Sequence, residues 1–135
     1  MIHTTTIRPR FCETDALGHI NNVSYFIYFE QARVEFFIDS QIEKNLEGWS
    51  FVLASAHCDF RKQAYLHQSL MVMTTVSHIG RSSVKLKHRM IDQSTEEFIA
   101  EGEDVLVRVN LTTQKSEPLT EDMITILKNY FANEH

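Results

Sequence analysis

The chain has 135 residues, of which 43% are hydrophobic and 23% charged, and its formal net charge is −5. This length predicts a single domain over residues 1–135, and the composition is that of an ordinary soluble protein. The acidic balance argues against nucleic-acid binding, which needs a basic surface to displace counterions from phosphates.

The N-terminal segment and the cysteines indicate in which cellular compartment the protein is expected. The opening segment MIHTTTIRPRF lacks the apolar core of a signal peptide, and no apolar run approaches 18 residues, so no membrane span is predicted. Cys12 and Cys58 fit no disulfide framework or zinc spacing. The histidines form no helical pair and no cluster with cysteine, so no metal or other cofactor is expected. We therefore expect a cytoplasmic protein with two reduced thiols.

The first half of the chain predicts one strand and one long helix. Residues 2–11 are rich in Thr and Ile and favour a strand, in which Pro9 marks an edge position or the strand's end. From about Asn22 to about Asn45 no turn signal interrupts the chain, which predicts a helix of about six turns. The segment VSYFIYFEQARVEFFI is apolar on nearly every face. Such a helix is buried, so other elements must surround it.

The second half predicts four strands and a short helix. Residues 50–62, 69–79, 82–91 and 97–111 alternate as extended strands do, with turns at 78–81 and 92–95. Glu101 and Glu103 interrupt the last strand, whose apolar residues share one parity: Ile99, Val105, Val107, Val109 and Leu111. After Pro118 a helical apolar repeat predicts an amphipathic helix capped by Thr120. This order predicts an α+β architecture, a curved antiparallel five-stranded sheet wrapped around the long central helix.

A polar cluster lies immediately before the long helix, in the segment RFCETDALGHINN. The first turn of a helix has N–H groups without partners, and the helix dipole favours negative charge there. A thioester carbonyl held against these donors would have its developing oxyanion stabilised. Asp15 precedes Asn22 across a loop that contains Gly18, so its carboxylate could attack the same carbonyl or activate water. These parts suffice to hydrolyse an activated ester.

This segment resembles the signature of the hotdog-fold thioesterases of the 4-hydroxybenzoyl-CoA thioesterase superfamily. The pattern D-x-x-G-H-[IV]-N-N-x-x-Y precedes their central helix and is matched here by Asp15, Gly18, His19, Asn21, Asn22 and Tyr25. A frequent E-x-A-R continuation is matched by Glu30, Ala32 and Arg33, and the element order agrees over the whole chain. The resemblance implies a hotdog fold and hydrolysis of acyl-CoA or acyl-carrier-protein thioesters.

The resemblance also implies roles for individual residues. Asp15 matches the catalytic aspartate, described as nucleophile or general base, and the backbone N–H of Asn22 matches the oxyanion donor at the helix start. His19 and Asn22 stand where members acting on aryl-CoA have other residues, so the His-Ile-Asn-Asn form is more similar to the branch acting on aliphatic acyl thioesters. Relatives pair their sheets edge to edge and build the active site between subunits. Together with the very apolar helix, this predicts a homodimer or a homotetramer.

Structural interpretations of the same residues remain open. Asp15 could cap a turn or the helix, and either Asn21 or Asn22 could be the N-cap and so shape the site. His19 could be a loop histidine bound to backbone, and Gly18 is most simply a turn residue with positive φ. Tyr25 belongs to an aromatic stripe that is core, although its outer edge could line an acyl tunnel.

An acidic protein needs gathered positive charge to hold the phosphates of coenzyme A. Arg61 and Lys62 end the second predicted strand, in a segment that resembles a basic segment of the relatives. Arg81, with Ser82 and Lys85, combines a guanidinium with a hydroxyl and a turn, which suits phosphate oxygens. Arg81 is the preferred candidate.

Two other functions are compatible with a hotdog domain. A non-catalytic acyl-CoA-binding domain, such as the sensing half of a regulator, would leave Asp15 unexplained, and no helix-turn-helix is attached. A dehydratase or hydratase usually pairs a histidine with an acid in a different arrangement. The sequence leaves open the acyl length, the leaving thiol and the choice between attack and water activation by Asp15.

Overall fold

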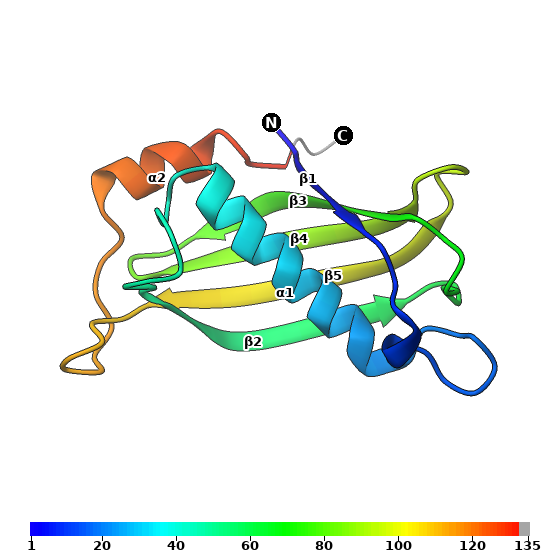
Figure 1. The fold of residues 1–135 in the computed structure, drawn as a ribbon. Helices are drawn as coiled ribbons and strands as arrows, with labels where there is room; N and C mark the ends of the chain where they lie inside the picture. The colour runs from blue at the N-terminus through cyan, green and yellow to red at the C-terminus, as the bar shows by residue number, and fades with distance from the viewer. Residues whose placement is uncertain (133–135) are drawn as a thin grey trace.

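The computed structural model describes residues 1–132, in which one long helix lies across an antiparallel sheet (Figure 1). The strands pair in the order β1-β3-β4-β5-β2, and every neighbouring pair is antiparallel. In chain order the elements are β1 (His3–Ile7), a 3₁₀ turn η1 (Phe11–Glu13), α1 (Asn22–Asp39), β2 (Phe51–Phe60), β3 (Leu70–Ile79), β4 (Ser83–Asp92), β5 (Phe98–Arg108) and α2 (Glu121–Lys128). This is the predicted α+β architecture.

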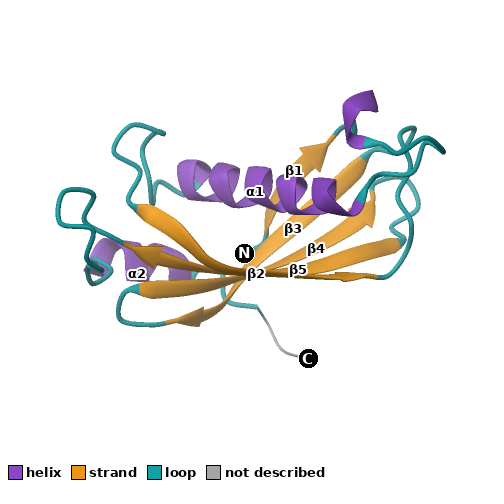
Figure 2. Cartoon of the chain, turned by 90° about the horizontal axis from the view of Figure 1, so that it is seen from below, coloured by secondary structure: helices purple, strands orange, loops and turns teal. Residues whose placement is uncertain are grey.

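One face of α1 packs against the sheet, which curves beneath it (Figure 2). The side chains on this face are at most 2% exposed: Tyr25, Tyr28, Phe29, Ala32, Phe36 and Phe37. Burying a large apolar side chain contributes about 1.5–3 kcal/mol, so this aromatic face holds the helix on the sheet. The cluster around Phe36 and Phe37 continues into Trp49 and α2.

The opposite face of α1 is not covered in the single chain. Val23 is 69% exposed, Phe26 39% and Ile27 44%. The expectation that other elements surround the helix is therefore wrong for its N-terminal half within residues 1–132. Five strands cover one side of the helix, and β2 is the last strand of the sheet.

Two predicted element boundaries need correction. α1 ends at Asp39 instead of near Asn45, because Gln41 takes a left-handed backbone conformation with φ 69° that no helix continues through. The chain then folds back, and the carboxylate of Glu43 accepts hydrogen bonds from the N–H and hydroxyl of Ser50. β1 ends at Ile7, ahead of Pro9, whose missing N–H could not pair with β3.

From Ala100 onward, the core face of β5 is the parity opposite to that of Val105 and Val107. Gly102 lies under the ring of Phe29, and Val105 and Val107 lie half-buried on the other face, beside Glu101 and Glu103. On that outer face Lys87 pairs with Glu101 at 2.8 Å, and Lys85 pairs with Glu103 at 3.8 Å. The buried residues of β5 are Ile99, Ala100, Gly102, Asp104 and Leu106.

A polar group of residues sits within this core face. His88 Nε2 lies 2.6 Å from Asp104 Oδ2, and His88 Nδ1 lies 2.8 Å from the hydroxyl of Thr74. Arg33 of α1 reaches Asp104 at 3.4 Å, and the ring of Phe29 stacks on His88 with centroids 5.2 Å apart. Buried polar groups are tolerated when they are paired, so this cluster ties α1 to the middle of the sheet.

The C-terminal helix α2 begins as predicted, with the Thr120 hydroxyl accepting a hydrogen bond from Met123 N–H at 3.1 Å. Leu127 is its fully buried residue and joins the cluster around Phe36. Within the described residues, neither helix has the length and apolar character needed to cross a membrane.

Candidate active site

The loop that carries Asp15 is a short hairpin. Thr14 and Ile20 form an antiparallel bridge, and the N–H of Asp15 donates to the carbonyl of His19 at 2.8 Å. Gly18 has φ 80°, which is the left-handed conformation that the sequence predicted for the turn. Residues 65–66 hold the far side of the loop, because the Leu66 N–H donates to the Gly18 carbonyl.

The two carboxylate oxygens of Asp15 have different environments. Oδ1 accepts hydrogen bonds from the N–H groups of Leu17 at 2.8 Å and His19 at 3.1 Å, which is the turn-capping role considered as an alternative. Oδ2 faces His19 Nδ1 at 3.9 Å, and the Asp15 side chain is 46% exposed. Capping therefore uses one oxygen and leaves the other facing His19 in a half-exposed side chain.

His19 is packed as well as polar. Its backbone pairs with Tyr65, and its ring meets the Tyr65 ring edge to face with centroids 4.9 Å apart. This contact fixes the imidazole on the side of the loop that bears Asp15 Oδ2.

The start of α1 leaves backbone donors without partners. Asn21 is the N-cap, which confirms one of the two capping alternatives, and its side-chain oxygen accepts from Ser24 N–H at 2.9 Å. Neither the Asn22 N–H nor the Val23 N–H has a hydrogen-bond partner among residues 1–132, and both residues are exposed. These donors stand at the positive end of an 18-residue helix, so the position can stabilise an anion.

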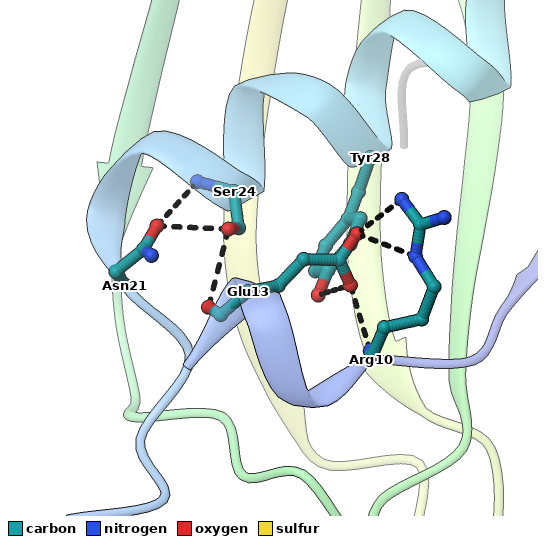
Figure 3. Close-up of polar contacts among 5 residues, drawn as sticks. All are labelled: Arg10, Glu13, Asn21, Ser24 and Tyr28. Carbon is teal, nitrogen blue, oxygen red and sulfur yellow. Dashed lines mark hydrogen bonds and ion pairs between the residues drawn. The ribbon is translucent and has the colours of Figure 1, made fainter. Parts of the chain in front are cut away.

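Glu13, which the sequence did not single out, joins the Asp15 loop to α1 (Figure 3). Its carboxylate is 7% exposed and accepts from the Arg10 N–H, the Arg10 guanidinium and the Tyr28 hydroxyl at 2.8–3.2 Å. Its carbonyl accepts from Asn21 N–H at 3.0 Å and from the Ser24 hydroxyl at 3.2 Å. The sequence held one local signal for it, the i, i+3 spacing of Arg10 and Glu13.

The ionisation of these groups follows from their contacts. Burial alone would raise the pKa of Glu13, but the hydrogen bonds from Arg10 and Tyr28 outweigh it and hold the pKa below its usual value. Burial, followed by the neighbouring Glu13 carboxylate, raises the pKa of Tyr28 well above its ordinary value. The pair therefore consists of a carboxylate acceptor and a neutral hydroxyl donor across the working pH range.

A hollow of about 200 Å³ opens beside the helix start, lined by Asn22, Tyr25, Phe60, Arg61, Lys62 and Gln63. Tyr25 is 1% exposed and accepts a hydrogen bond from Ala64 N–H at 3.0 Å, so it fixes the segment after β2 instead of presenting its hydroxyl to a ligand. Lys62 is ion-paired with Glu97, and the Arg61 guanidinium lies 5.8 Å from the Phe98 ring.

Two further hollows, of about 240 and 180 Å³, lie between α1 and β2, and both are bordered by Glu30, Arg33 and Leu53. The smaller one continues along the exposed face of the helix past Val23 and Ile27. Together these hollows form an open groove, here called the α1–β2 groove, that begins at the turn of α1 bearing the free N–H groups.

The predicted phosphate contacts fall into two groups. Arg61 and Lys62 lie beside the helix start, whereas Arg81 and Ser82 form the β3–β4 turn at the opposite end of the sheet (Figure 1). The backbone carbonyls of Arg81 and Ser82 accept from Leu119 and Arg108, and Lys85 follows on β4. A single chain therefore does not bring Arg81, Ser82 or Lys85 to Asp15.

Within residues 1–132 no three His, Cys, Asp or Glu side chains come together in a group that could hold a metal ion. The chemistry available near Asp15 is that of a carboxylate, an imidazole and backbone donors.

Comparison with known proteins identifies the family. The model of the thioesterase-like superfamily matches residues 9–127. The chain belongs to the thioesterase-like superfamily. Uncharacterized protein YsmA of Bacillus subtilis is 33% identical over 116 residues, which cover 86% of this chain and 78% of YsmA. The acyl-CoA thioesterase YbgC of Helicobacter pylori is 32% identical over 79 residues, which cover 58% of this chain and 59% of YbgC.

Solved structures of this superfamily have the same fold. The structure of a predicted thioesterase from Bacillus stearothermophilus superposes with a TM-score of 0.90 at 29% identity and covers 100% of both chains. A thioesterase from Thermus thermophilus, complexed with coenzyme A and Zn, has a TM-score of 0.83 at 27% identity and covers 97% of this chain and 95% of its own. The predicted hotdog fold and the predicted thioesterase family are thus confirmed.

Proposed function

We propose that this superfamily member hydrolyses acyl-CoA or acyl-carrier-protein thioesters to a free acid and a thiol, with Asp15 as the catalytic carboxylate. The observation that carries the proposal is the half-exposed Asp15 side chain in a hairpin that is bonded to the start of α1, where Asn22 and Val23 offer free N–H groups. The coenzyme A bound to the Thermus thermophilus thioesterase supports CoA esters as the substrate class.

The thioester carbonyl oxygen would accept a hydrogen bond from the Asn22 N–H, and this bond would strengthen as the oxygen becomes an oxyanion. Asp15 Oδ2 could attack the carbonyl carbon, expel the thiolate and form an anhydride that water then hydrolyses. Alternatively it could take a proton from water as that water attacks. Both routes consume one water and give one acid and one thiol. His19, 3.9 Å from Oδ2, would orient the carboxylate or the water.

The acyl chain would lie in the α1–β2 groove. The N-terminal part of the groove is apolar, with Val23, Phe26 and Ile27 on the helix and Leu53 on the strand. An aliphatic chain gains about 0.8 kcal/mol for each methylene removed from water, so such a groove favours alkyl over polar acyl groups. Gly18 and Asn21 would shape the carbonyl end of this path through the turn and the helix cap.

A homodimer would complete the site. Within residues 1–132, β2 has a strand neighbour on one edge only, and Val52, Leu53 and Phe60 are 43–46% exposed beside the uncovered face of α1. An edge strand with free N–H and C=O groups next to an apolar helix face is a natural pairing surface. A second copy pairing antiparallel at β2 would cover both.

The same pairing would determine which basic residues contact the coenzyme A part of the substrate. Antiparallel β2 edges would place the β3–β4 end of one sheet toward the helix start of the other, with neighbouring strands about 4.8 Å apart. Arg81, Ser82 and Lys85 would then contact a substrate bound to the other subunit, whereas Arg61 and Lys62 would contact one bound to their own. An effect of Arg81→Ala on KM would thus depend on dimer formation.

The dimer is tested by light scattering at micromolar concentration on the wild type and on Leu53→Lys, with Leu111→Lys as the matched control in the loop that follows β5. We expect Leu53→Lys to shift the protein toward monomer and to lose activity, because a charge in a closed interface is costly. Leu111 is 60% exposed, so its variant should remain wild-type-like. A fully active monomer would contradict the proposal.

The function itself is tested by a screen of acyl-CoA and acyl-carrier-protein esters of increasing chain length, with the released thiol detected by colour. We expect turnover with a preference for aliphatic acyl groups. Tight binding of acyl-CoA without release of thiol from any ester would instead support a non-catalytic acyl-CoA-binding domain.

A further inference from the structure

Glu13 is a buried charge that the proposed reaction does not use. Its carboxylate lies at the end of η1, two residues before Asp15, and is 7% exposed. Burying a carboxylate is unfavourable unless several donors compensate for the lost water. Four hydrogen bonds converge here: Oε1 accepts from Arg10 N–H and the Tyr28 hydroxyl, and Oε2 accepts from Arg10 Nε and Nη2.

We propose that Glu13 is a positioning residue that holds Asp15 in register with the N–H groups at the start of α1; this rests on the proposed function. Asp15 itself sits in an exposed hairpin, so its position relative to the helix depends on what fixes the base of that hairpin. Glu13 fixes it from both sides (Figure 3).

The Glu13 carboxylate contacts the second turn of the helix through Tyr28. Tyr28 is 2% exposed and lies a turn and a half beyond the first residue of α1, so its hydroxyl anchors Glu13 to a rigid part of the fold. Arg10 approaches from the strand side and is exposed, with its guanidinium held against the carboxylate.

The backbone carbonyl of Glu13 contacts the N-cap of the helix. The Glu13 carbonyl accepts from Asn21 N–H and from the Ser24 hydroxyl, and the Ser24 N–H donates to the Asn21 side chain. One residue thus contacts the N-cap and the second turn of the helix while it carries the chain into Asp15. A shift of Glu13 would move the carboxylate relative to the oxyanion donors, and a misplacement of about 1 Å can cost on the order of 100-fold in rate.

A carboxylate is needed because every partner is a donor. In Glu13→Gln the amide oxygen can keep the Arg10 N–H and Tyr28 bonds, but the NH₂ group would face the Arg10 guanidinium, donor against donor. Glu13→Ala would remove all four bonds and leave the buried Tyr28 hydroxyl unpaired. Tyr28→Phe would remove one bond and leave the carboxylate with Arg10.

The experiment compares steady-state kinetics of Glu13→Ala, Glu13→Gln and Tyr28→Phe with the wild type. The matched control is Glu43→Ala, which removes another buried carboxylate that accepts two hydrogen bonds from Ser50, beyond the far end of α1. We expect Glu13→Ala to lower kcat about 10- to 100-fold with KM within about 3-fold, and Glu13→Gln and Tyr28→Phe to lie between it and the wild type. Glu43→Ala should lose stability while kcat remains unchanged.

A double variant separates positioning from general damage. If Glu13 acts through Asp15, Glu13→Ala should slow an Asp15→Asn background by less than about 2-fold, because the group it positions is already gone. An equal loss in both backgrounds, or an unchanged kcat in Glu13→Gln and Tyr28→Phe, would overturn the inference. Because these two variants keep most of the contacts, they decide the matter even if Glu13→Ala does not fold. An Asp15→Asn protein with wild-type turnover would instead overturn the proposed function.

Discussion

Gly102→Ala is the change whose cost can be worked out most directly from the structure. Gly102 lies in the middle of β5, and an added Cβ would stand 2.7, 2.8 and 3.1 Å from three ring carbons of Phe29. Ordinary van der Waals contact begins near 3.4 Å, so the ring or the strand must move by several tenths of an ångström. The ring cannot retreat freely, because Phe29 is buried in the core and its ring also stacks on the imidazole of His88.

Overpacking of this kind typically costs about 1–3 kcal/mol. Replacing glycine by alanine recovers up to about 1 kcal/mol by restricting the unfolded chain, since Gly102 has no left-handed φ. We therefore expect a net loss of about 1–2 kcal/mol, which for a chain of this size lowers Tm by roughly 3–8 °C. Differential scanning calorimetry at fixed protein concentration measures this shift.

Phe29→Leu provides the internal control for this reasoning. Alone it should destabilise by leaving a cavity, but in the Gly102→Ala background it makes room for the new methyl group. The double variant should be less destabilised than the sum of the two single variants by about 0.5 kcal/mol or more. Strict additivity, or a Gly102→Ala protein as stable as the wild type, would refute the claim that contact with Phe29 is the reason for a glycine at this position.

Two further predictions concern titratable groups. Burial raises the pKa of the half-buried Cys58 thiol to about 11, so at pH 8 a disulfide reagent should modify exposed Cys12 rapidly and Cys58 much more slowly; rapid modification of both would contradict this. In the folded protein the pKa of Glu13 lies below its ordinary value of 4.5. The pKa of Asp92 is also lowered, chiefly by the hydrogen bond from the Thr95 N–H. Both contribute stability that is present above the unfolded pKa and is lost as pH falls through the folded pKa. Urea titrations should therefore show stability declining below about pH 4.5, with a shallower decline in Glu13→Gln.

Local rules predicted the features that depend on nearby residues. Asn21 and Thr120 cap the two helices as their positions before apolar repeats indicated, and Gly18 takes the positive φ expected of a turn. The order of elements was also predictable, because strand alternation and helix length are local signals. Asp15 was predicted as the catalytic carboxylate from a short motif that resembles that of the thioesterase family, and this role stays a prediction.

Features that depend on distant contacts were not predictable in this way. The role of Glu13 needs Tyr28, which approaches it only after the chain has turned into the helix. The core face of β5 could not be predicted from its apolar residues, because its inward positions include Gly102 and Asp104, which carry no apolar signal and are explained by Phe29 and His88 on other elements. Sequence periodicity reports hydrophobicity along one element, whereas the residue types at these positions are determined by shape and charge contacts with other elements.

The central claim is that the Asp15 carboxylate performs the chemistry, and the kcat of Asp15→Asn on an aliphatic acyl-CoA tests it most directly. The amide keeps the shape and can still accept the Leu17 and His19 N–H bonds, but it can neither attack nor take a proton. We expect kcat to fall by about 100-fold or more with Tm little changed, while the exposed-carboxylate control Asp122→Asn retains full activity. A correctly folded Asp15→Asn protein that turns over at the wild-type rate would contradict the account.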